Sequence, residues 1–526
     1  MTFKERYLRA RQLGGAPHSA FQSEALFERT QFDFIVLGAG SAGSIVAGNL
    51  AKAYPELSIA LIEAGPPVSA SDKTVWDPTQ WVLVSEDKNL EWGYKSTPQP
   101  GLDNRVIGMG RARGLGGCAL HNAMVYVRGG SKGYNNWAQN LGCPGWDYAD
   151  NVPYFDQVES QVHVTIAQQD PFIADLIGAA ENNGLVYNHN YNENLNEACV
   201  SPFQFAIASD GRRETTYSTY LEAVYPNLIV ATGVTIERIL IEGKTARGVV
   251  VSSGCLQLEL SATREIILST GAIGSPHLLM LSGIGPAAAL TAHGIKVELD
   301  APGVGQNFQD DLFVTAAWRS KKPMPPQPYG LMGAVLFGNS SNNSGNLGTD
   351  IECSLAAGTM AGMGLPPSEQ QSYWIYPNLQ LLKSRGTVSL ASSDPYTAPI
   401  IDPKYLSDPE DMINCLDGLK LALAIGADPA MVDWMGDELL PASGQGDSDL
   451  EAYIRQSAGT CYHYAGTCRM GSDAQAVTTP DLRVSGIDGL RVIDASVIPQ
   501  LVSGNCAAAT MMIAEKGSQF ILEGNP

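Results

Sequence analysis

Three glycines near the amino end have the spacing of a phosphate-binding turn. Gly38, Gly40 and Gly43 fit the pattern G-x-G-x-x-G, and Ser41 and Ala42 fill the two positions before the last glycine. In such a turn the first glycine permits the tight bend, the second lets the backbone approach a pyrophosphate, and the third lets helix and strand pack closely. Amides at the start of the following helix would point at the phosphates. The spacing therefore predicts a dinucleotide site.

A carboxylate stands where the ribose of such a nucleotide would lie. Glu63 comes 20 residues after Gly43, at the end of a short apolar segment, and Ala64 follows it. A carboxylate at this place would accept hydrogen bonds from ribose hydroxyls, and it disfavours a 2′-phosphate. The motif alone does not separate FAD from NAD. The alternative interpretation is a tight glycine turn that binds no ligand.

The elements that must position these residues form a predicted strand–turn–helix–strand unit. Residues 32–37 form an apolar strand, residues 44–52 carry apolar side chains at helical spacing, and residues 58–62 form a second buried strand. Residues 227–243 and 246–260 alternate in polarity like paired strands. We therefore expect one sheet to be assembled from segments that lie far apart in the chain.

Later segments predict a second sheet and a closing helix. Residues 379–389 and 400–405 have the pattern of strands, and a helix is expected at residues 172–183 and again from residue 507 onward. At 526 residues the chain is too long for a single core, so two domains are expected. The motifs cluster in separated stretches, which indicates that one domain is inserted into the other.

The chain is acidic but otherwise has the composition of an ordinary folded enzyme. Its formal net charge is -21, which disfavours binding to nucleic acid and to anionic lipid surfaces. No stretch has the length and apolarity expected of a membrane span, and the first residues lack the apolar core of a secretory signal. Nine cysteines without a C-x-x-C pair predict reduced thiols and a cytoplasmic location.

Several longer segments resemble signatures of the glucose–methanol–choline (GMC) oxidoreductase family. They are RARGLGGCALHNAMVYVRG at 111–129, STGAIGSPHLLMLSGIGP at 269–286, PGVGQNFQD at 302–310, and the carboxy-terminal stretches 462–471, 492–496 and 503–505. The resemblance runs from about residue 30 to 522, with the motifs in the family's order. It implies bound FAD, covalent or noncovalent, and oxidation of primary or secondary alcohols.

The resemblance also implies the fold class and a division into domains. It implies an α/β (α+β) protein with a Rossmann-like FAD-binding domain assembled from separated segments, plus an inserted substrate domain built from an antiparallel sheet and helices. The predicted division is a lead-in over 1–31, an FAD-binding domain over 32–134, 226–311 and 456–526, and a substrate-binding domain over 135–225 and 312–455.

The resemblance assigns the catalytic pair to His463 and Asn505. His463 lies in a Tyr-His-x-x-Gly-Thr segment that matches the family's catalytic histidine, and Asn505 matches a position held by either His or Asn. The pair is thus similar to that of choline oxidase. Removing a hydride from an alcohol carbon requires a base for the hydroxyl proton and a donor for its oxygen. We interpret His463 as the base and Asn505 as the group that orients the oxygen.

Further site residues follow from the same resemblance. Tyr462 and Tyr464 are expected at the substrate, although many relatives have Pro in place of Tyr464. No metal site is expected. The residues expected to contact FAD are Gly38, Gly40, Ser41, Ala42, Gly43, Glu63, Ala64, Arg111, Gly116, Gly117, His121, Asn122, Met124, Val125, Ile236, Asp494 and Ala495.

The most specific hypothesis concerns His121. Most relatives have a hydrophobic residue there, whereas the segment from Gly116 to Asn122 resembles the context in which choline oxidase bonds a histidine to the flavin 8α carbon. We therefore predict that FAD is attached covalently through His121. The alternative is an unlinked histidine packed near the flavin edge. A second departure is Asp311, which stands where His usually follows Gln-Asp, so that no role can be carried over to it.

The substrate and the electron acceptor stay open at this point. Tyr373, Trp374 and Tyr376 either line an aromatic pocket or pack a core, and Glu352 is a candidate carboxylate for a cationic alcohol. Dioxygen is the expected acceptor, with a dehydrogenase that uses a quinone or dye as the alternative. A lyase or photodecarboxylase on the same scaffold is a further alternative, against which the His463–Asn505 pair argues. The oligomeric state is open, with a homodimer as one option.

Overall fold

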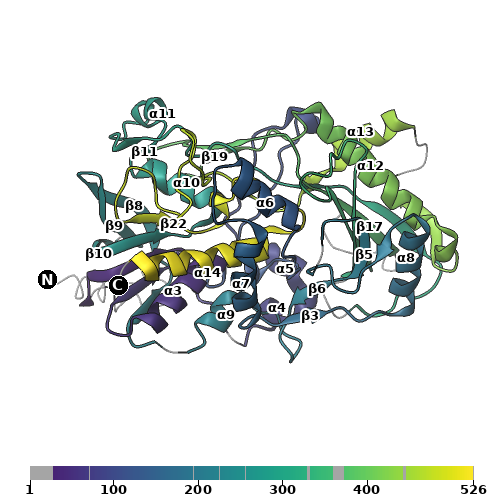
Figure 1. Ribbon diagram of the computed structural model, residues 1–526, viewed down its shortest axis with the longest axis horizontal. Coiled ribbons are helices and arrows are strands. Elements are labelled where there is room, and N and C mark those ends of the chain that lie inside the picture. The colour runs from purple at the N-terminus through teal and green to yellow at the C-terminus, as the bar shows by residue number, and fades with distance from the viewer. Residues whose placement is uncertain are drawn as a thin grey trace.

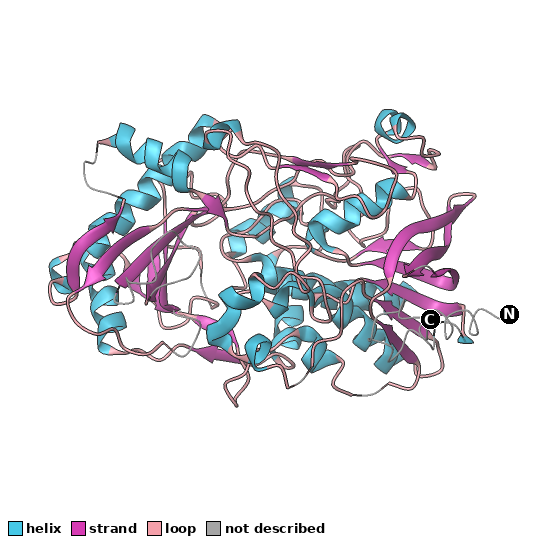
Figure 2. Ribbon diagram, turned by 180° about the vertical axis from the view of Figure 1, so that it is seen from behind, coloured by secondary structure: helices cyan, strands magenta, loops and turns pink. Residues whose placement is uncertain are grey.

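Two large sheets stand near opposite ends of an elongated molecule (Figures 1 and 2). The computed structural model describes residue 26 and residues 28–524, except 70, 194, 224, 255, 328–331, 359–371 and 442–445. The predicted lead-in over 1–31 therefore lies mostly outside the described residues. Helices α3 and α14 lie beside the first sheet, and α8 and α12 lie beside the second (Figure 1). The protein is a mixed α/β protein, as expected from the sequence.

The first sheet combines three stretches of chain that are far apart in sequence. Its strands follow the order β7-β2-β1-β10-β9-β8, and β22 also pairs with β10. The pairs among β7, β2, β1, β10 and β22 are parallel, whereas β9 pairs antiparallel with both β8 and β10. The strands are β1 (Gln31–Leu37), β2 (Ile59–Ile62), β7 (Leu228–Ala231), β8 (Thr235–Glu242), β9 (Thr245–Ser253), β10 (Leu256–Leu268) and β22 (Leu490–Val492).

The centre of this sheet is apolar on both faces. All four residues of β2 and the last four of β1 are buried, as expected for parallel strands that helices cover on either side. Helix α3 (Ser41–Ala53) packs against α14 (Cys506–Gly524), so the last helix of the chain lies against the first described long helix. The predicted strands 32–37 and 58–62, the helix 44–52 and the helix from 507 onward are confirmed.

The second sheet is antiparallel apart from its β4–β5 pair. Its described strands follow the order β20-β14-β17-β16-β15-β5-β4, and β13 joins β17 to β21. One face is covered by α8 (Pro171–Asn182) and α12 (Pro409–Gly426). The strands are β4 (Val186–Tyr187), β5 (Cys199–Pro202), β13 (Leu312–Phe313), β14 (Ala316–Ser320), β15 (Met332–Gly338), β16 (Ile351–Ala357), β17 (Ser372–Leu379), β20 (Met435–Leu440) and β21 (Gly459–Thr460).

One expectation about this sheet is wrong. Residues 379–389 and 400–405 do not extend it: β18 (Thr387–Ser389) pairs only with β19 (Ile400–Asp402), in a separate two-stranded sheet. Leu381 explains the interruption, because its φ of 55° lies in the left-handed region, where a strand cannot continue. The chain therefore turns directly after β17, which β13 joins to β21.

Shorter elements connect the two sheets. Helix α7 packs against α14 and α9 packs against α3, so the stretch between α6 and α9 also contacts the helices of the first sheet. In the described part of the chain, no helix combines the length and apolarity needed to cross a bilayer. The elements are α4 (Lys73–Trp76), η1 (Pro78–Gln80), α5 (Trp81–Ser85), η2 (Pro100–Leu102), η3 (Gly117–Leu120), α6 (Ser131–Asn140), α7 (Tyr148–Glu159), β3 (Val164–Ile166), β6 (Gln204–Ala206), α9 (Thr216–Tyr220), α10 (Gly271–Leu281), β11 (Ile284–Gly285), α11 (Ala287–Ala292), β12 (Leu299–Asp300), η4 (Pro429–Met431), α13 (Asp447–Ser457) and η5 (Ala495–Val497).

Candidate active site

The two residues expected to do the chemistry are in direct contact. Asn505 Nδ2 lies 3.0 Å from Nε2 of His463, across 42 positions of sequence. His463 follows β21 of the second sheet, and Asn505 immediately precedes α14 beside the first sheet, so the pair bridges the two halves of the molecule. The Oδ1 atom of Asn505 is buried and has no hydrogen-bond partner among the described residues. The amide thus keeps hydrogen-bonding capacity at the site.

Two adjacent aspartates hold His463 from behind. Nδ1 of His463 lies 2.9 Å from Oδ2 of Asp311, a side chain with 0% exposure. Oδ1 of Asp310 accepts the backbone N–H of His463 at 2.9 Å, and its Oδ2 accepts hydroxyls from Tyr405 and Thr460, each at 2.5 Å. Burial raises the pKa of Asp310 to about 6, against the hydrogen bonds from Thr460 and Tyr405. The aspartates therefore fix both the ring and the backbone of the candidate base.

The surroundings of His463 favour its protonated form. Burial by itself lowers the pKa of the imidazole, but the hydrogen bond and charge of Asp311 raise it, and so do the charges of Glu352 and Asp310. The net result is a pKa above the ordinary histidine value. Burial also raises the pKa of Asp311, while the hydrogen bond and charge of His463 oppose that rise. A base tuned in this way binds a proton firmly once it has taken one.

The backbone before His463 is held in an unusual conformation. Tyr462 has a φ of 64°, a left-handed conformation that costs a non-glycine residue about 1–3 kcal/mol. Its N–H donates to the Thr460 hydroxyl at 2.8 Å, and its carbonyl accepts Nη2 of Arg111 at 2.5 Å. The Tyr462 side chain is 45% exposed, so of the two predicted substrate contacts it is the accessible one.

Tyr464, the other predicted substrate contact, is buried in the core at 1% exposure. The guanidinium of Arg111 lies 4.3 Å from the centre of its ring, and the ring of Phe308 lies 5.4 Å away. Its hydroxyl reaches Thr460 Oγ1 at 3.3 Å, beside the aspartate that holds the catalytic backbone. Arg111, expected at the cofactor, thus also braces the segment on either side of His463.

The glycine-rich turn has no room for side chains. Gly38 has a φ of 95°, and a Cβ atom on Gly43 would lie 1.9 Å from the Gly38 carbonyl oxygen. A Cβ atom on Gly117 would lie 2.6 Å from Cα of Gly40, so the two predicted glycine segments touch backbone to backbone. Gly116 N–H donates to the Ala39 carbonyl at 2.8 Å and secures this contact. Such a bare surface at the start of α3 fits a pyrophosphate.

The acidic residues expected around the nucleotide order this turn. Glu63 accepts the backbone N–H of Ala39 at 3.0 Å and that of Gly65 at 2.8 Å, while the Ala64 carbonyl accepts from Arg113. Asp494 accepts the N–H of Gly271 at the start of α10, the N–H of Ser496 and the hydroxyl of Ser275. Its neighbour Ala495 offers its carbonyl to Gly466 N–H at 3.3 Å. Ile236 lies on β8, where it pairs with Val251.

His121 lies directly after η3, in an environment opposite to that of His463. Burial, together with the charges of Arg111 and Arg213, lowers the pKa of its imidazole to about 3. Oε2 of Glu91 is 4.0 Å from Nε2, but a ring with so low a pKa is neutral, so we treat this as proximity and not as an ion pair. Nε2 is buried and has no hydrogen-bond partner among the described residues. His121 is thus a neutral ring whose Nε2 makes no hydrogen bond with the described residues.

Arg213 is the main site residue that sequence reasoning missed. It is 2% exposed, and it donates to the carbonyls of Val75, Ala119 and Asn122 and to Oδ1 of Asn122. Burial lowers the pKa of this guanidinium to about 9. Nothing in the local sequence marked it, because its partners lie about 90 to 140 positions away.

The segment after His121 is also tightly held. Asn122 Oδ1 accepts the N–H of Met124 at 3.1 Å, and Met124 has a φ of 59°. Val125 forms a bridge with Phe205 of β6, in the small β3–β6 sheet. Asn122, Met124 and Val125, expected to contact FAD, therefore belong to one loop that Arg213 ties to the body of the protein.

The aromatic residues of β17 lie on both faces of the second sheet. Along β17, Tyr373 points to the helix-covered face, where its hydroxyl donates to the Gly426 carbonyl, so it belongs to the core. Trp374 and Tyr376 belong to the other cluster, with ring centres 5.7 Å apart. Glu352 interacts electrostatically with His463, and burial raises its pKa to about 7. The aromatic candidates thus divide between the two faces, and Glu352 lies on the side of the catalytic residues.

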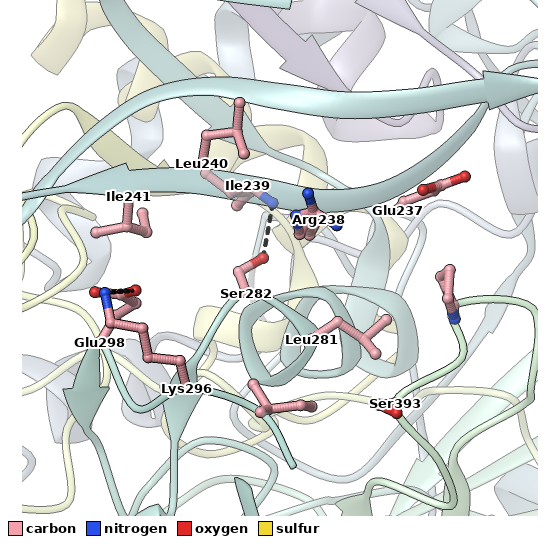
Figure 3. A pocket seen from close by; sticks show the side chains of 12 residues that line it. Glu237, Arg238, Ile239, Leu240, Ile241, Leu281, Ser282, Lys296, Glu298 and Ser393 are labelled. Carbon is pink, nitrogen blue, oxygen red and sulfur yellow. Dashed lines mark hydrogen bonds and ion pairs between the residues drawn. The ribbon is translucent and has the colours of Figure 1, made fainter. Parts of the chain in front are cut away.

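A surface pocket of about 370 Å³ opens elsewhere, over β8 and the end of α10 (Figure 3). Ser282 Oγ accepts the N–H of Ile239 at 2.8 Å there, and Lys296 pairs with Glu298 at 2.7 Å. None of the predicted site residues lines this pocket. It is therefore separate from the candidate active site.

Sequence comparisons identify relatives along almost the whole chain. The model of the N-terminal GMC oxidoreductase domain matches residues 32–313, and that of the C-terminal domain matches residues 383–514. The chain is 32% identical to the oxygen-dependent choline dehydrogenase of Paraburkholderia phymatum over 92% of this chain and 91% of that protein. It is also 32% identical to the protein of the same name from Ectopseudomonas mendocina, over 94% of this chain and 95% of the relative.

Solved structures have the same fold. Pyridoxine 4-oxidase from Mesorbium loti superposes with a TM-score of 0.86 at 28% identity, covering 93% of this chain and 98% of that one. Formate oxidase from Aspergillus oryzae superposes with a TM-score of 0.87 at 24% identity, covering 94% and 99% of the two chains. The second likeness bears on the fold alone.

Proposed function

The chain belongs to the GMC oxidoreductase family, and from that premise we propose that His463 and Asn505 carry out the FAD-dependent oxidation of an alcohol to an aldehyde or ketone. The observation that carries this proposal is the 3.0 Å contact between Nε2 of His463 and the Asn505 amide. A base and a hydrogen-bond donor that converge on one point are what an alcohol hydroxyl requires.

FAD, the cofactor of this family, supplies the acceptor for the hydride when it is bound. His463 Nε2 takes the hydroxyl proton, so the alcohol loses one proton to the protein and one hydride to the cofactor. Asn505 donates through Nδ2 to the substrate oxygen while negative charge develops on it. A positioned base contributes about 10²–10⁴-fold, and one such donor about 10²–10³-fold.

The residues described here fit FAD. Gly40 touches Gly117 backbone to backbone, and Gly43 is crowded against the Gly38 carbonyl. Because these positions are glycines, the backbone at the start of α3 has no side chains that would keep phosphates away. Glu63 would accept ribose hydroxyls with its remaining lone pairs. Asp494 and Ala495 lie at the start of η5, close to α10, where they would face the middle of the cofactor. We propose the domain division given above, with Tyr462 at the substrate and Tyr464 supporting it from behind.

We also propose that His121 bonds to the flavin 8α carbon through Nε2. This atom is buried, neutral and without a partner among the described residues, as a nucleophile should be. The N–C bond would replace one hydrogen of the imidazole and one hydrogen of the 8α methyl group. The flavin would supply the two-electron oxidising capacity for this exchange, with dioxygen as the final acceptor of the two electrons and two protons. The test is denaturation in acid: a yellow protein pellet supports the bond, and a colourless pellet contradicts it.

Dioxygen is the proposed final acceptor. The choline dehydrogenases named above are called oxygen-dependent, and the solved neighbours are called oxidases. Peroxide formation in air, measured with a coupled peroxidase, would support this acceptor, whereas turnover only with a quinone or dye would contradict it. The proposed location is the cytoplasm, because all eight cysteines in the described residues are free.

The decisive experiment mixes the holoenzyme with alcohols in the absence of oxygen. A panel of choline, pyridoxine, benzyl alcohol and simple aliphatic alcohols spans cationic, aromatic and neutral substrates. We expect at least one alcohol to bleach the visible absorbance of the flavin, and the His463→Ala holoenzyme to stay yellow. If dithionite bleaches the wild-type flavin but a broad set of alcohols does not, alcohol oxidation is the wrong reaction.

A further inference from the structure

We propose that Asp311 is a positioning residue that fixes the protonation pattern of His463, so that Nδ1 carries the hydrogen and Nε2 always faces the substrate as the base. This inference rests on the proposed function and deepens it. It assigns a task to a position where the sequence departs from the pattern of the family.

The argument begins with what a carboxylate can do. An ionised carboxylate only accepts hydrogen bonds, so the 2.9 Å contact with Asp311 Oδ2 requires a hydrogen on Nδ1 of His463. A neutral imidazole carries one ring hydrogen, so Nε2 is then the acceptor. The 3.0 Å contact with Asn505 is satisfied only if the amide presents its NH₂ group to that nitrogen. One carboxylate therefore sets the state of the ring and the orientation of the amide beyond it.

The orientation of the amide has an observable counterpart. With Nδ2 turned to His463, Oδ1 of Asn505 points elsewhere, and it is the amide atom that has no partner among the described residues. An alcohol hydroxyl that replaces the direct contact between the two groups can donate to Nε2 and accept from Nδ2. Asp311, His463 and Asn505 are thus linked by two consecutive contacts. Nε2 of His463 is the acceptor for the hydroxyl hydrogen, and Nδ2 of Asn505 is the donor to the hydroxyl oxygen.

The buried surroundings of Asp311 and His463 stabilise the hydrogen on Nδ1 of the ring. Asp311 is 0% exposed, so water does not compete for Nδ1. The charged groups that act on the pair are Asp310, which holds the backbone of His463, Glu352 on β16, and Arg385, whose charge favours the ionised form of Asp311. Once the base is protonated, the carboxylate stabilises the imidazolium across a buried hydrogen bond. The same contact therefore serves the resting enzyme and the state after proton transfer.

The first test requires no substrate. Holoenzyme labelled with ¹⁵N-histidine is measured by long-range ¹H–¹⁵N NMR at a pH where His463 is neutral, and the His463→Ala spectrum identifies its signal. We expect Nδ1 to be protonated and Nε2 to be bare. A spectrum with the hydrogen on Nε2 would overturn the proposal, whatever alcohol the enzyme oxidises. Failure of this inference is thereby separated from failure of the proposed function.

The second test uses Asp311→Asn with the alcohol that bleaches the wild-type flavin fastest. We expect kcat to fall by about 10²-fold or more with little change in KM, as for other histidine bases that lose their carboxylate. Because Asp311 raises the pKa of His463, its loss should move the rising limb of the rate–pH profile to lower pH. Asp311→Glu should restore part of the rate and return the limb toward its wild-type position.

A matched control separates positioning from general damage. Asp428 is another buried aspartate, and its carboxylate accepts from Asn182, Asn183 and the N–H of Ala430, away from His463 and Asn505. Asp428→Asn should lower the melting temperature and leave the rate–pH profile unchanged. The proposal fails if Asp311→Asn retains the wild-type rate and the wild-type limb, or if Asp428→Asn shifts the limb as far as Asp311→Asn does.

Discussion

The two histidines of the site have opposite surroundings. His463 is surrounded by Asp311, Asp310 and Glu352, which together raise its pKa. His121 lies near Arg111 and Arg213, and burial with these two charges lowers its pKa to about 3. Both rings are buried, so desolvation favours the neutral form of each. The sign of the neighbouring charges therefore decides the difference between them.

This contrast indicates two different tasks for one side-chain type. A ring that must take a proton and hold it is improved by nearby carboxylates. A ring that must form a bond through its lone pair is improved by anything that prevents protonation, and two guanidiniums do so. The catalytic end of the site is thus acidic, and the end proposed for covalent attachment is cationic.

The largest effect is expected at the acidic end, from His463→Ala. Flavin reduction by the alcohol should slow on the order of 10⁴-fold, because no nearby group replaces the base. Stopped-flow absorbance under anaerobic conditions measures this rate. Retained flavin in the variant serves as the control for folding, and a loss below tenfold would contradict the role of His463.

Asn505→Ala should produce the next largest effect. The variant keeps the base but removes the donor to the substrate oxygen, so the rate of flavin reduction should fall by about 10²–10³-fold. The primary deuterium isotope effect with a deuterated alcohol should persist, since hydride removal would limit the rate even more. An unchanged rate would show that the 3.0 Å contact to His463 has no catalytic purpose.

At the cationic end, His121→Ala should abolish covalent retention of flavin while the protein still binds FAD. We expect a smaller fall in turnover, about tenfold, because the variant removes no group from the catalytic pair. In the wild type, attachment should be independent of pH above about 4, since the pKa of His121 is about 3. Flavin reduction should instead decline as the pH falls through the pKa of His463 and the base becomes protonated. If flavin attachment and flavin reduction show the same pH dependence, the proposed difference between the pKa values of His121 and His463 is wrong.

Arg213→Met should weaken the cationic end more mildly. Without the guanidinium the pKa of His121 rises, so attachment should slow by a few fold and acquire a dependence on acidic pH. The variant also leaves the carbonyls of Val75, Ala119 and Asn122 without their donor, at a cost of about 1–3 kcal/mol. Arg213→Lys keeps the charge, and it is the matched control. Equal attachment rates at acidic pH in both variants would contradict an electrostatic role.

The smallest effect is expected in the surface pocket over β8. Lys296→Ala breaks the exposed ion pair with Glu298 and should change neither flavin attachment nor flavin reduction. Both assays described above measure this variant directly. A marked effect on either would link the pocket to the active site.

Local rules in the sequence were enough to predict the glycine turn and its strands. Gly43 is crowded against Gly38, only five positions away, so the spacing contains that part of the information. The close approach of Gly38 to Ser269 and of Gly40 to Gly117 joins distant segments, and the spacing does not predict it. The pKa shifts of His463 and His121 could not be predicted from the sequence. They depend on Asp311, Glu352 and Arg213, which lie far along the chain from the rings they influence. Leu381 illustrates the same limit: its left-handed conformation ended a strand that the apolar pattern had extended.

Strand β22 has a consequence for how the protein is made. It pairs with the end of β10, at the edge of a sheet whose other strands all lie between residues 31 and 268. The segment on either side of β22 also contains His463 and Asn505. On the ribosome, the first sheet therefore waits for β22 and for helix α14 until residues 490–524 have been made. We expect cofactor loading to follow synthesis of these residues, so that a polypeptide that stops before them does not accumulate as a yellow, reactive fragment.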